Sequence, residues 1–237
     1  DFEEKLKIAD LFLLCNPHNP LGFVWEREDL KRMVDLCIKY HVPVFSDEIH
    51  SDLIFHGKKH IPTATVSDEA ANYVVTGISG TKTFNLAGLQ ASTAVFPNAY
   101  MKKKFDTFWS NMDIHRNNAF SLIAMETAFN EGEEWLEQLL PYISANFDYV
   151  VDYLEKNIPQ IKTYAPDATY LMWLDCRALG LDDEALNRFF IDKAKLGLNA
   201  GNSFGRSLSG YMRLNVACPR SVLEQAMKQL EEAVKSL

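Results

Sequence analysis

Short apolar runs alternate with a helical pattern along the first hundred residues. The runs are LFLLC (11–15), VPVFS (42–46), YVVTGI (73–78) and ASTAVF (91–96), each with the length of a buried strand. Between the first two, EREDLKRMVDLCIKY (26–40) repeats apolar residues at the spacing of one helix face. Nearly continuous apolar strands separated by helices predict an α/β fold with a mostly parallel sheet covered on both faces.

From about residue 99 the sequence changes to long helices followed by a second, smaller α/β unit. We expect residues 1–130 to form part of a large sheet domain. Residues 131–237 are expected to form an interdomain helix and a small C-terminal α/β domain. This division depends on predicted helices at 118–140, 143–158 and 182–194, strands at 169–175 and 211–216, a Gly-rich loop at 199–205 and a final amphipathic helix from Pro219.

Composition narrows the class of protein. Hydrophobic residues make up 47% and charged residues 24% of the 237 residues, as in ordinary globular proteins. The net charge of −8 argues against a nucleic-acid partner, and the basic run MKKKF (101–105) is expected to be a solvated helix face. No apolar run is long enough to span a bilayer, so no membrane association is expected.

The four cysteines lie far apart in the sequence without paired spacing. They are therefore expected to be free thiols in a reducing compartment, which indicates a cytoplasmic protein without a disulfide or zinc framework. The chain opens without methionine at DFEEKLKIAD (1–10), which has the pattern of the end of a helix that leads into a strand. We expect an upstream region to precede it.

Polar residues follow three successive strands of the predicted sheet. Asn19 comes after the first strand, Asp47 ends the second, and Ser79, Thr81 and Lys82 follow the third. Because parallel strands deliver their carboxyl ends to one edge of the sheet, these residues form a candidate ligand site.

Four motifs carry a resemblance to a known family. NPHNPLG (16–22), SDEIH (46–50), SGTKTFNLAGLQ (79–90) and YMRLNVACPR (211–220), in this order, resemble the class I/II aminotransferases among the fold-type I enzymes of pyridoxal 5′-phosphate (PLP). The resemblance covers essentially the whole chain and implies an aspartate-aminotransferase-like fold. The forms DEIH and KTFNLAGLQ are most similar to the branch of cystathionine β-lyases and related carbon-sulfur β-lyases.

The resemblance implies roles for three of the residues at the sheet edge. Lys82 would bond covalently to PLP and move the α-proton of the substrate. Asp47 would pair with the nitrogen of the pyridine ring, and Asn19 would donate a hydrogen bond to the phenolic oxygen of the ring. Each also has a plain structural explanation, because Lys82 can be a solvated turn lysine, Asp47 or Glu48 a helix cap, and the asparagine part of a double turn.

The resemblance also assigns Ser79 and Thr81 to the phosphate of PLP, although both could simply be small polar loop residues. Members of the family often add an arginine a few residues after the lysine, and TFNLAGLQ (83–90) has none. The predicted phosphate site is therefore incomplete in this chain.

His50 stands where many aminotransferases carry a tyrosine that faces the cofactor, which favours the lyase branch. It can equally be a satisfied histidine at a strand end. A metal site made from His50, His56, His60 and the acidic pair Asp47 and Glu48 lacks a recognised ligand spacing, so none is expected.

Arg213 matches the arginine of the family that binds the α-carboxylate of the substrate through two parallel hydrogen bonds. Its apolar strand neighbours agree with that role, and a structural ion pair is the alternative. Arg220 is expected to begin the last helix, and Tyr170 and Trp173 to pack in the core of the small domain.

The resemblance implies a PLP-dependent carbon-sulfur β-lyase that acts on cystathionine or cysteine-type amino acids and releases a thiol, pyruvate and ammonia. The alternatives are a PLP-dependent aminotransferase of amino acids and a non-catalytic, ligand-sensing domain of a regulator. A homodimer with sites at the interface is also implied. Because the upstream segment of the family contributes to these sites, we expect the chain alone to bind PLP poorly and to turn over little.

Overall fold

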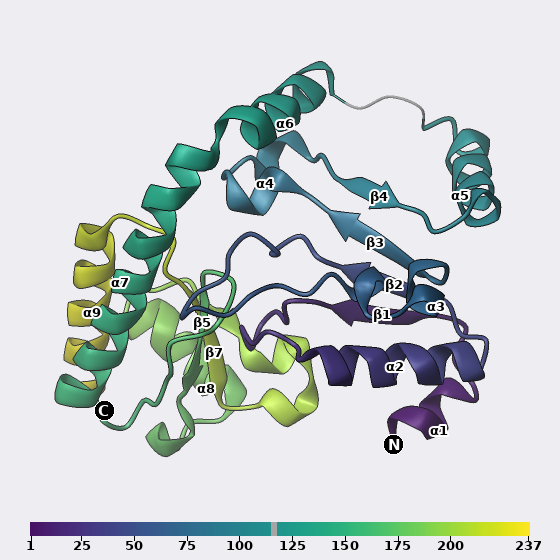
Figure 1. Cartoon of the computed structure of the whole chain (residues 1–237). Helices are drawn as coiled ribbons and strands as arrows, with labels where there is room; N and C mark the ends of the chain where they lie inside the picture. The colour runs from purple at the N-terminus through teal and green to yellow at the C-terminus, as the bar shows by residue number, and fades with distance from the viewer. Residues whose placement is uncertain (115–117) are drawn as a thin grey trace. The chain divides into compact units, whose positions relative to one another are not determined.

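A computed structural model describes residues 1–114 and 118–237 (Figure 1). The chain forms two compact units. Unit 1 comprises Asp1–His18 and Phe23–Glu137, and unit 2 comprises Asn19–Gly22 and Gln138–Leu237. The short segment Asn19–Gly22 thus belongs to unit 2, although the residues on both sides of it belong to unit 1. The assignment of these units to a large sheet domain and a small domain of an enzyme stays a prediction.

Unit 1 contains a four-stranded sheet with the order β1-β2-β3-β4. Strands β1 (Phe12–Cys15), β2 (Val44–Asp47) and β3 (Val74–Ile78) are parallel, and β4 (Thr93–Val95) pairs antiparallel with β3. The four apolar runs therefore form the predicted strands, and the prediction of a mostly parallel sheet is confirmed.

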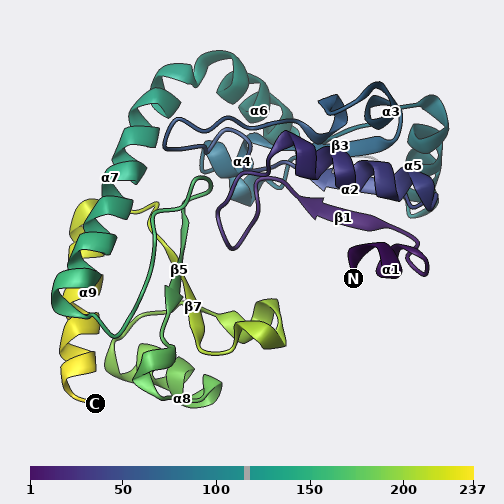
Figure 2. The same cartoon turned by 60° about the horizontal axis from the view of Figure 1, so that its bottom comes forward.

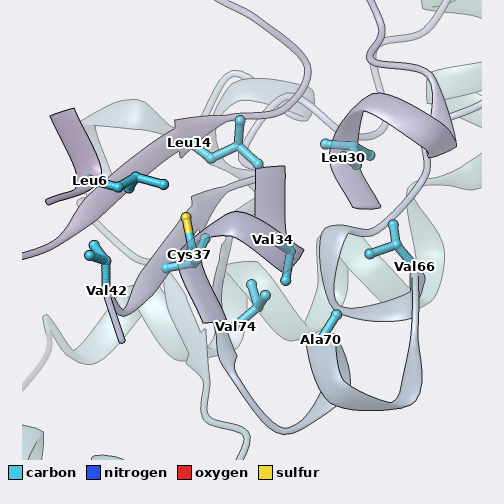
Figure 3. Close-up of a cluster of buried hydrophobic side chains, with 10 residues drawn as sticks. Leu6, Leu14, Leu30, Val34, Cys37, Val42, Val66, Ala70 and Val74 are labelled. Atoms are coloured by element: carbon cyan, nitrogen blue, oxygen red, sulfur yellow. The ribbon is translucent and has the colours of Figure 1, made fainter. Parts of the chain in front are cut away.

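One face of this sheet carries the core of unit 1. Helix α2 (Arg27–Lys39) follows β1, and the short helix α3 (Asp68–Ala71) follows β2. Figure 3 shows apolar side chains of α2 and α3 converging on side chains of the strands. The buried members of this cluster are Leu6, Leu14, Leu30, Val34, Cys37, Val42, Val44, Val66, Ala70 and Val74.

The opposite face differs from the prediction at β1. Leu13 points to the side away from Leu14 and is 69% exposed, so cover on both faces is wrong for this strand within the described residues. The cause is topological. Since β1, β2 and β3 follow one another in a single direction across the sheet, right-handed crossovers bring α2 and α3 to the same face.

The other helices of unit 1 lie before β1, between β3 and β4, and after β4. The first, α1, precedes β1 as the sequence predicted, and α5 contains the basic run 101–105, which is solvated as expected. Helix α6 has apolar residues around its whole circumference, yet its only buried residue is Ser121. The bounds are α1 (Phe2–Leu6), α4 (Gly80–Thr83), α5 (Ala99–Asn111) and α6 (Ala119–Glu131).

The long helical region breaks at Gly132 instead of near Pro141. Helix α7 (Glu133–Asn157) runs without interruption through Pro141, whereas α6 ends before Gly132. A side chain at position 132 would lie 2.3 Å from the carbonyl oxygen of Ala128 and 2.4 Å from the Phe84 ring. Only glycine fits this close approach, so tertiary packing sets the break.

Unit 2 is built on an antiparallel sheet with the order β5-β7-β6, formed by β5 (Leu171–Asp175), β6 (Asn199–Ala200) and β7 (Tyr211–Asn215). Figure 2 shows α7 and α9 (Arg220–Lys235) side by side next to this sheet. The predicted helix at 182–194 is present as α8 (Asp183–Arg188) and a π-helical turn at Phe189–Lys193. The predicted Gly-rich loop begins with β6, a short strand that its composition concealed.

Buried Asn146 connects α7 to the segment between β7 and α9. Its Nδ2 donates to the carbonyl oxygens of Val216 and Cys218, and its Oδ1 accepts a hydrogen bond from Nε of Arg220. The connection between β7 and α9 is thereby fixed to α7. Arg220 begins the last helix, as expected, and Trp173 is buried.

Within residues 1–114 and 118–237, no helix is long and apolar enough to cross a membrane. The four cysteines are free thiols, as predicted. Single turns of 3₁₀ helix complete the fold at Thr63–Thr65, Ala87–Leu89, Arg177–Leu179, Gly201–Phe204 and Arg206–Leu208.

A buried polar network fixes the end of β2. The Glu48 carboxylate is 2% exposed and accepts hydrogen bonds from Ser46 Oγ (2.8 Å), the Thr63 backbone N–H (2.9 Å) and His60 Nε2 (2.8 Å). Asn16, which follows β1, extends the network by donating from Nδ2 to Thr63 Oγ1 (3.0 Å). Glu48 is therefore a structural pairing residue at the end of β2.

Replacement of Glu48 by alanine should destabilise unit 1. The change leaves a hydroxyl, a backbone N–H and an imidazole without their shared acceptor, and it should lower the free energy of unfolding by about 3 kcal/mol or more. Urea denaturation followed by tryptophan fluorescence measures this loss. Exposed Glu28 is the matched control, because its replacement by alanine should change stability by less than about 1 kcal/mol. Equal effects of the two substitutions would contradict the role of the network.

The same carboxylate should make stability depend on pH. Burial alone would raise the pKa of Glu48, but hydrogen bonds from His60, Thr63 and Ser46 outweigh it, so the pKa is lowered from its ordinary value of 4.5. The stabilisation is fully present above 4.5 and is lost as pH falls through the lower pKa of the folded state. The difference in unfolding free energy between the wild type and Glu48→Gln should therefore shrink in this acid window. A difference independent of pH would exclude Glu48 as its source.

Candidate active site

In unit 1, two residues of opposite charge lie at the carboxyl edge of the sheet. Asp47 ends β2, and Lys82 lies in the short helix α4, directly after β3. Burial raises the pKa of the Asp47 carboxyl, while a hydrogen bond from the Ile49 backbone N–H (3.2 Å) and attraction to Lys82 lower it in part. Among the described residues, the Lys82 amine has no hydrogen bond and no ion pair. The edge therefore carries the Lys82 amine, which has no hydrogen-bond partner among the described residues, and the Asp47 carboxylate, which is partly shielded from water.

Helix α4 is held in place on both sides of Lys82. Ser79 caps its first turn by accepting a hydrogen bond from the Thr81 backbone N–H (3.1 Å). At its other end, Thr83 Oγ1 donates to the carboxylate of Asp52 (2.8 Å), which belongs to the loop that follows β2. The two strand ends are therefore linked through α4. No local sequence pattern predicts the contact between Thr83 and Asp52, because 31 positions separate the two residues.

The two predicted phosphate ligands form hydrogen bonds with the protein itself. Ser79 Oγ donates to the carbonyl oxygen of Ala91 (2.6 Å) and lies 2.7 Å from Thr81 Oγ1. Since the Ser79 proton is used, Thr81 donates to Ser79. Both hydroxyls are buried, and an anion would have to take over at least one of these hydrogen bonds. Their role toward phosphate stays a prediction.

His50 is buried in the turn after β2, where its carbonyl oxygen accepts a hydrogen bond from the Leu53 backbone N–H (3.0 Å). The role of His50 toward a cofactor stays a prediction. His60 Nε2 forms a hydrogen bond with the Glu48 carboxylate (2.8 Å). In the part of the chain that the structure describes, no group of three or more His, Cys, Asp or Glu side chains could hold a metal ion.

Unit 2 brings together the two remaining predicted site residues. Arg213 of β7 donates from Nη1 to Asn19 Oδ1 (2.9 Å) and from Nη2 to Asn199 Oδ1 (2.9 Å). The guanidinium lies over the ring of Phe204, with its carbon 4.7 Å from the ring centre. Burial lowers the pKa of Arg213, because neither asparagine neutralises its charge. The alternative of a structural ion pair is not supported by the described residues, none of which pairs a carboxylate with Arg213.

The segment Asn19–Gly22 is tightly fixed within unit 2. Tyr164 Oη donates to the Leu21 carbonyl oxygen (2.7 Å), and the Ala168 backbone N–H donates to the Gly22 carbonyl oxygen (2.8 Å). Gly22 has a φ of 67° and lies so close to Pro166 that a side chain would approach to 2.4 Å. These contacts place Asn19 beside Arg213.

The predicted site residues therefore fall into two groups. Asp47, His50, Ser79, Thr81 and Lys82 gather in unit 1, and Asn19 and Arg213 meet in unit 2. Sequence reasoning missed Asn199 and Phe204, the other partners of Arg213. Their position in a Gly-rich segment gave no sign of a polar contact with a strand.

Comparisons with known proteins identify the family of the chain. Residues 1–230 match the family model described as aminotransferase class I and II. Cystathionine β-lyase PatB of Bacillus subtilis (strain 168) is 41% identical over 239 residues, which cover 99% of this chain and 62% of that protein. The chain thus spans about three fifths of the length of the curated relatives that it matches first.

Solved structures show the same similarity. A PLP-bound candidate aminotransferase from Clostridium difficile 630 has a TM-score of 0.96 and 47% identity, with coverage of 99% of this chain and 61% of that one. Cystalysin from Treponema denticola, which contains PLP, has a TM-score of 0.94 and 33% identity, with coverage of 100% and 61%. The chain belongs to the class I and II aminotransferase family and has its aspartate-aminotransferase-like α/β fold.

Proposed function

We propose that the protein is a PLP-dependent carbon-sulfur β-lyase that acts on cystathionine or cysteine-type amino acids. The observation that carries the proposal is the placement of Lys82 and Asp47 at the carboxyl ends of adjacent parallel strands. The similarity to a cystathionine β-lyase and to PLP-containing cystalysin supports both the chemistry and the substrate class.

The described residues fit PLP. The unpaired amine of Lys82 suits a covalent bond to the aldehyde carbon of the cofactor, and the half-buried carboxylate of Asp47 suits its protonated ring nitrogen. Asn19 would donate to the phenolic oxygen, and the Ser79 and Thr81 hydroxyls would turn toward the phosphate. His50 would lie on the cofactor side of the turn after β2. When bound, PLP accepts the electrons left at the α-carbon of the substrate.

The protein's own residues would then act on the substrate. Arg213 would bind the α-carboxylate. The amine of the substrate would displace Lys82 from the cofactor, and the released Lys82 amine would remove the α-proton. Loss of the proton allows the bond between the β-carbon and sulfur to break, with the electron pair leaving on the thiolate. Addition of water completes the balance, so that each substrate yields one thiol, one pyruvate and one ammonium ion.

Replacement of Lys82 by alanine should abolish both covalent retention of PLP and turnover. With L-cystathionine as substrate, release of pyruvate and free thiol should fall at least about 1,000-fold, because the general base and the nucleophile are lost together. In the wild type, borohydride treatment followed by mass spectrometry should find the cofactor mass on the Lys82 peptide. Lys82→Arg keeps the charge without restoring the chemistry, and exposed Lys103→Ala should behave as the wild type.

Each other outcome of this experiment indicates a different function. Covalent PLP with amino transfer to a keto acid, and without pyruvate or thiol, would indicate an aminotransferase, the name given to the C. difficile relative. Bound PLP without either reaction would indicate a ligand-sensing domain. Absence of PLP from the full-length protein would contradict the proposal.

A homodimer is the second part of the proposal. Helix α6 is apolar around its circumference, and Phe120, Leu122 and Ile123 are 73%, 62% and 66% exposed among the described residues. A helix of this composition is normally buried, which supports an interface with a second copy.

Sedimentation equilibrium of the protein should give twice the mass of one polypeptide. The substitution Ile123→Asp should shift the mass toward the monomer, because it places a charge in an apolar contact, whereas Glu126→Gln on the same helix should not. A dimer that persists in Ile123→Asp would show that α6 is covered by other parts of the same polypeptide.

A further inference from the structure

Arg213 is a half-buried charge whose hydrogen-bond partners are all neutral. Nη1 and Nη2 each donate one hydrogen bond to an asparagine oxygen, and the Phe204 ring covers one face. A guanidinium has five N–H donors, so three remain, including Nε, which is buried and has no partner among the described residues. An unpaired, buried donor on a half-buried cation indicates that the counter-ion of Arg213 comes from a ligand.

The position of Asn199 is set by the sheet. Asn199 of β6 lies directly opposite Arg213 of β7 in an antiparallel pair, so both side chains project from the same face. The chain after β6 is held close to its neighbours at Gly201, where a side chain would lie 2.3 Å from the Leu208 carbonyl oxygen. The contact between Asn199 and Arg213 is therefore a cross-strand pair and not a chance encounter of loops.

The chemistry of the amide matters as much as its position. An amide oxygen accepts one N–H of Arg213 and fixes the plane of the guanidinium, but it leaves the charge uncompensated. An aspartate has the same shape, yet it would form an ion pair with Arg213 and occupy the position of an incoming carboxylate. Asn199 thus orients the guanidinium of Arg213 without neutralising its charge.

We propose that Asn199 is a positioning residue that holds the Arg213 guanidinium in the orientation that receives the carboxylate of the substrate. The inference rests on the proposed function, in which Arg213 binds that carboxylate. Asn199 would act through Arg213, and its effect would be confined to ligands that carry a carboxylate.

The test compares two inhibitors of the full-length enzyme with PLP bound. L-Alanine has the α-carboxylate but no leaving group on its β-carbon, and L-alaninamide replaces the carboxylate by a neutral amide. Asn199→Asp should raise the inhibition constant of L-alanine and the KM for L-cystathionine by about tenfold or more, with a smaller change in kcat. The inhibition constant of L-alaninamide should change by less than about twofold.

Controls separate this inference from the proposed function. Asn157→Asp adds the same charge at an exposed position of α7 and should leave all these constants unchanged. Asn199→Ala removes the hydrogen bond without adding a charge. It should raise the inhibition constant of L-alanine less than Asn199→Asp does. The side chain of Asn199 is exposed, so urea denaturation of both variants should follow the wild type.

Two results would overturn the inference alone. One is an equal change in the inhibition constants of L-alanine and L-alaninamide in Asn199→Asp. The other is an unchanged inhibition constant of L-alanine in Asn199→Asp, while Arg213→Lys still raises that constant. If Arg213→Lys leaves L-alanine binding unchanged, the carboxylate role of Arg213 fails, and with it this part of the proposed function.

Discussion

The parallel pairing of β2 with β3 is the constraint on which the candidate active site depends. Its register sets Asp47 opposite Gly77, so the two strands end nearly level and deliver Asp47 and Lys82 to the same edge. The pairing needs a glycine at position 77, because a side chain there would lie 2.7 Å from the ring of Phe45. A shift of the register by one residue would turn each strand over and bury the wrong side chains.

Two charged side chains, one in each unit, differ in how the protein meets the cost of removing them from water. Glu48 receives three hydrogen bonds from the protein, so its burial fixes the loops around β2. Arg213 receives only neutral partners and keeps an unpaired Nε. A buried group whose hydrogen bonds are all formed within the protein stabilises the fold. A group with an unused donor can instead form that hydrogen bond with a ligand.

Ser79 and Thr81 lie between these extremes. Their hydroxyls are buried and hydrogen-bonded to each other and to Ala91 in the protein alone. The protein therefore pays no penalty for unsatisfied hydroxyls without a ligand, and an anion must offer better hydrogen bonds than those it displaces. The absence of an arginine after Lys82 in the 83–90 segment makes this exchange more important for phosphate binding.

Features that depend on local pattern could be predicted from the amino-acid sequence. Apolar periodicity located the six longer strands and most of the longer helices, and the polar residues after three of these strands marked Asp47 and Lys82. Contacts between residues far apart in the chain became visible only in the folded protein. Tertiary packing placed Leu13 on an exposed face, put the helix break at Gly132, and paired Glu48 with His60.

The partners of Arg213 are the clearest example of this division. Asn19 lies 194 positions away in the chain, and Asn199 meets Arg213 only because β6 pairs with β7. Periodicity reports how each residue relates to its near neighbours, whereas these contacts follow from strand register and from the close approach of glycines. The type of the longer elements was therefore readable from the sequence, whereas packing fixed the environment of each functional side chain.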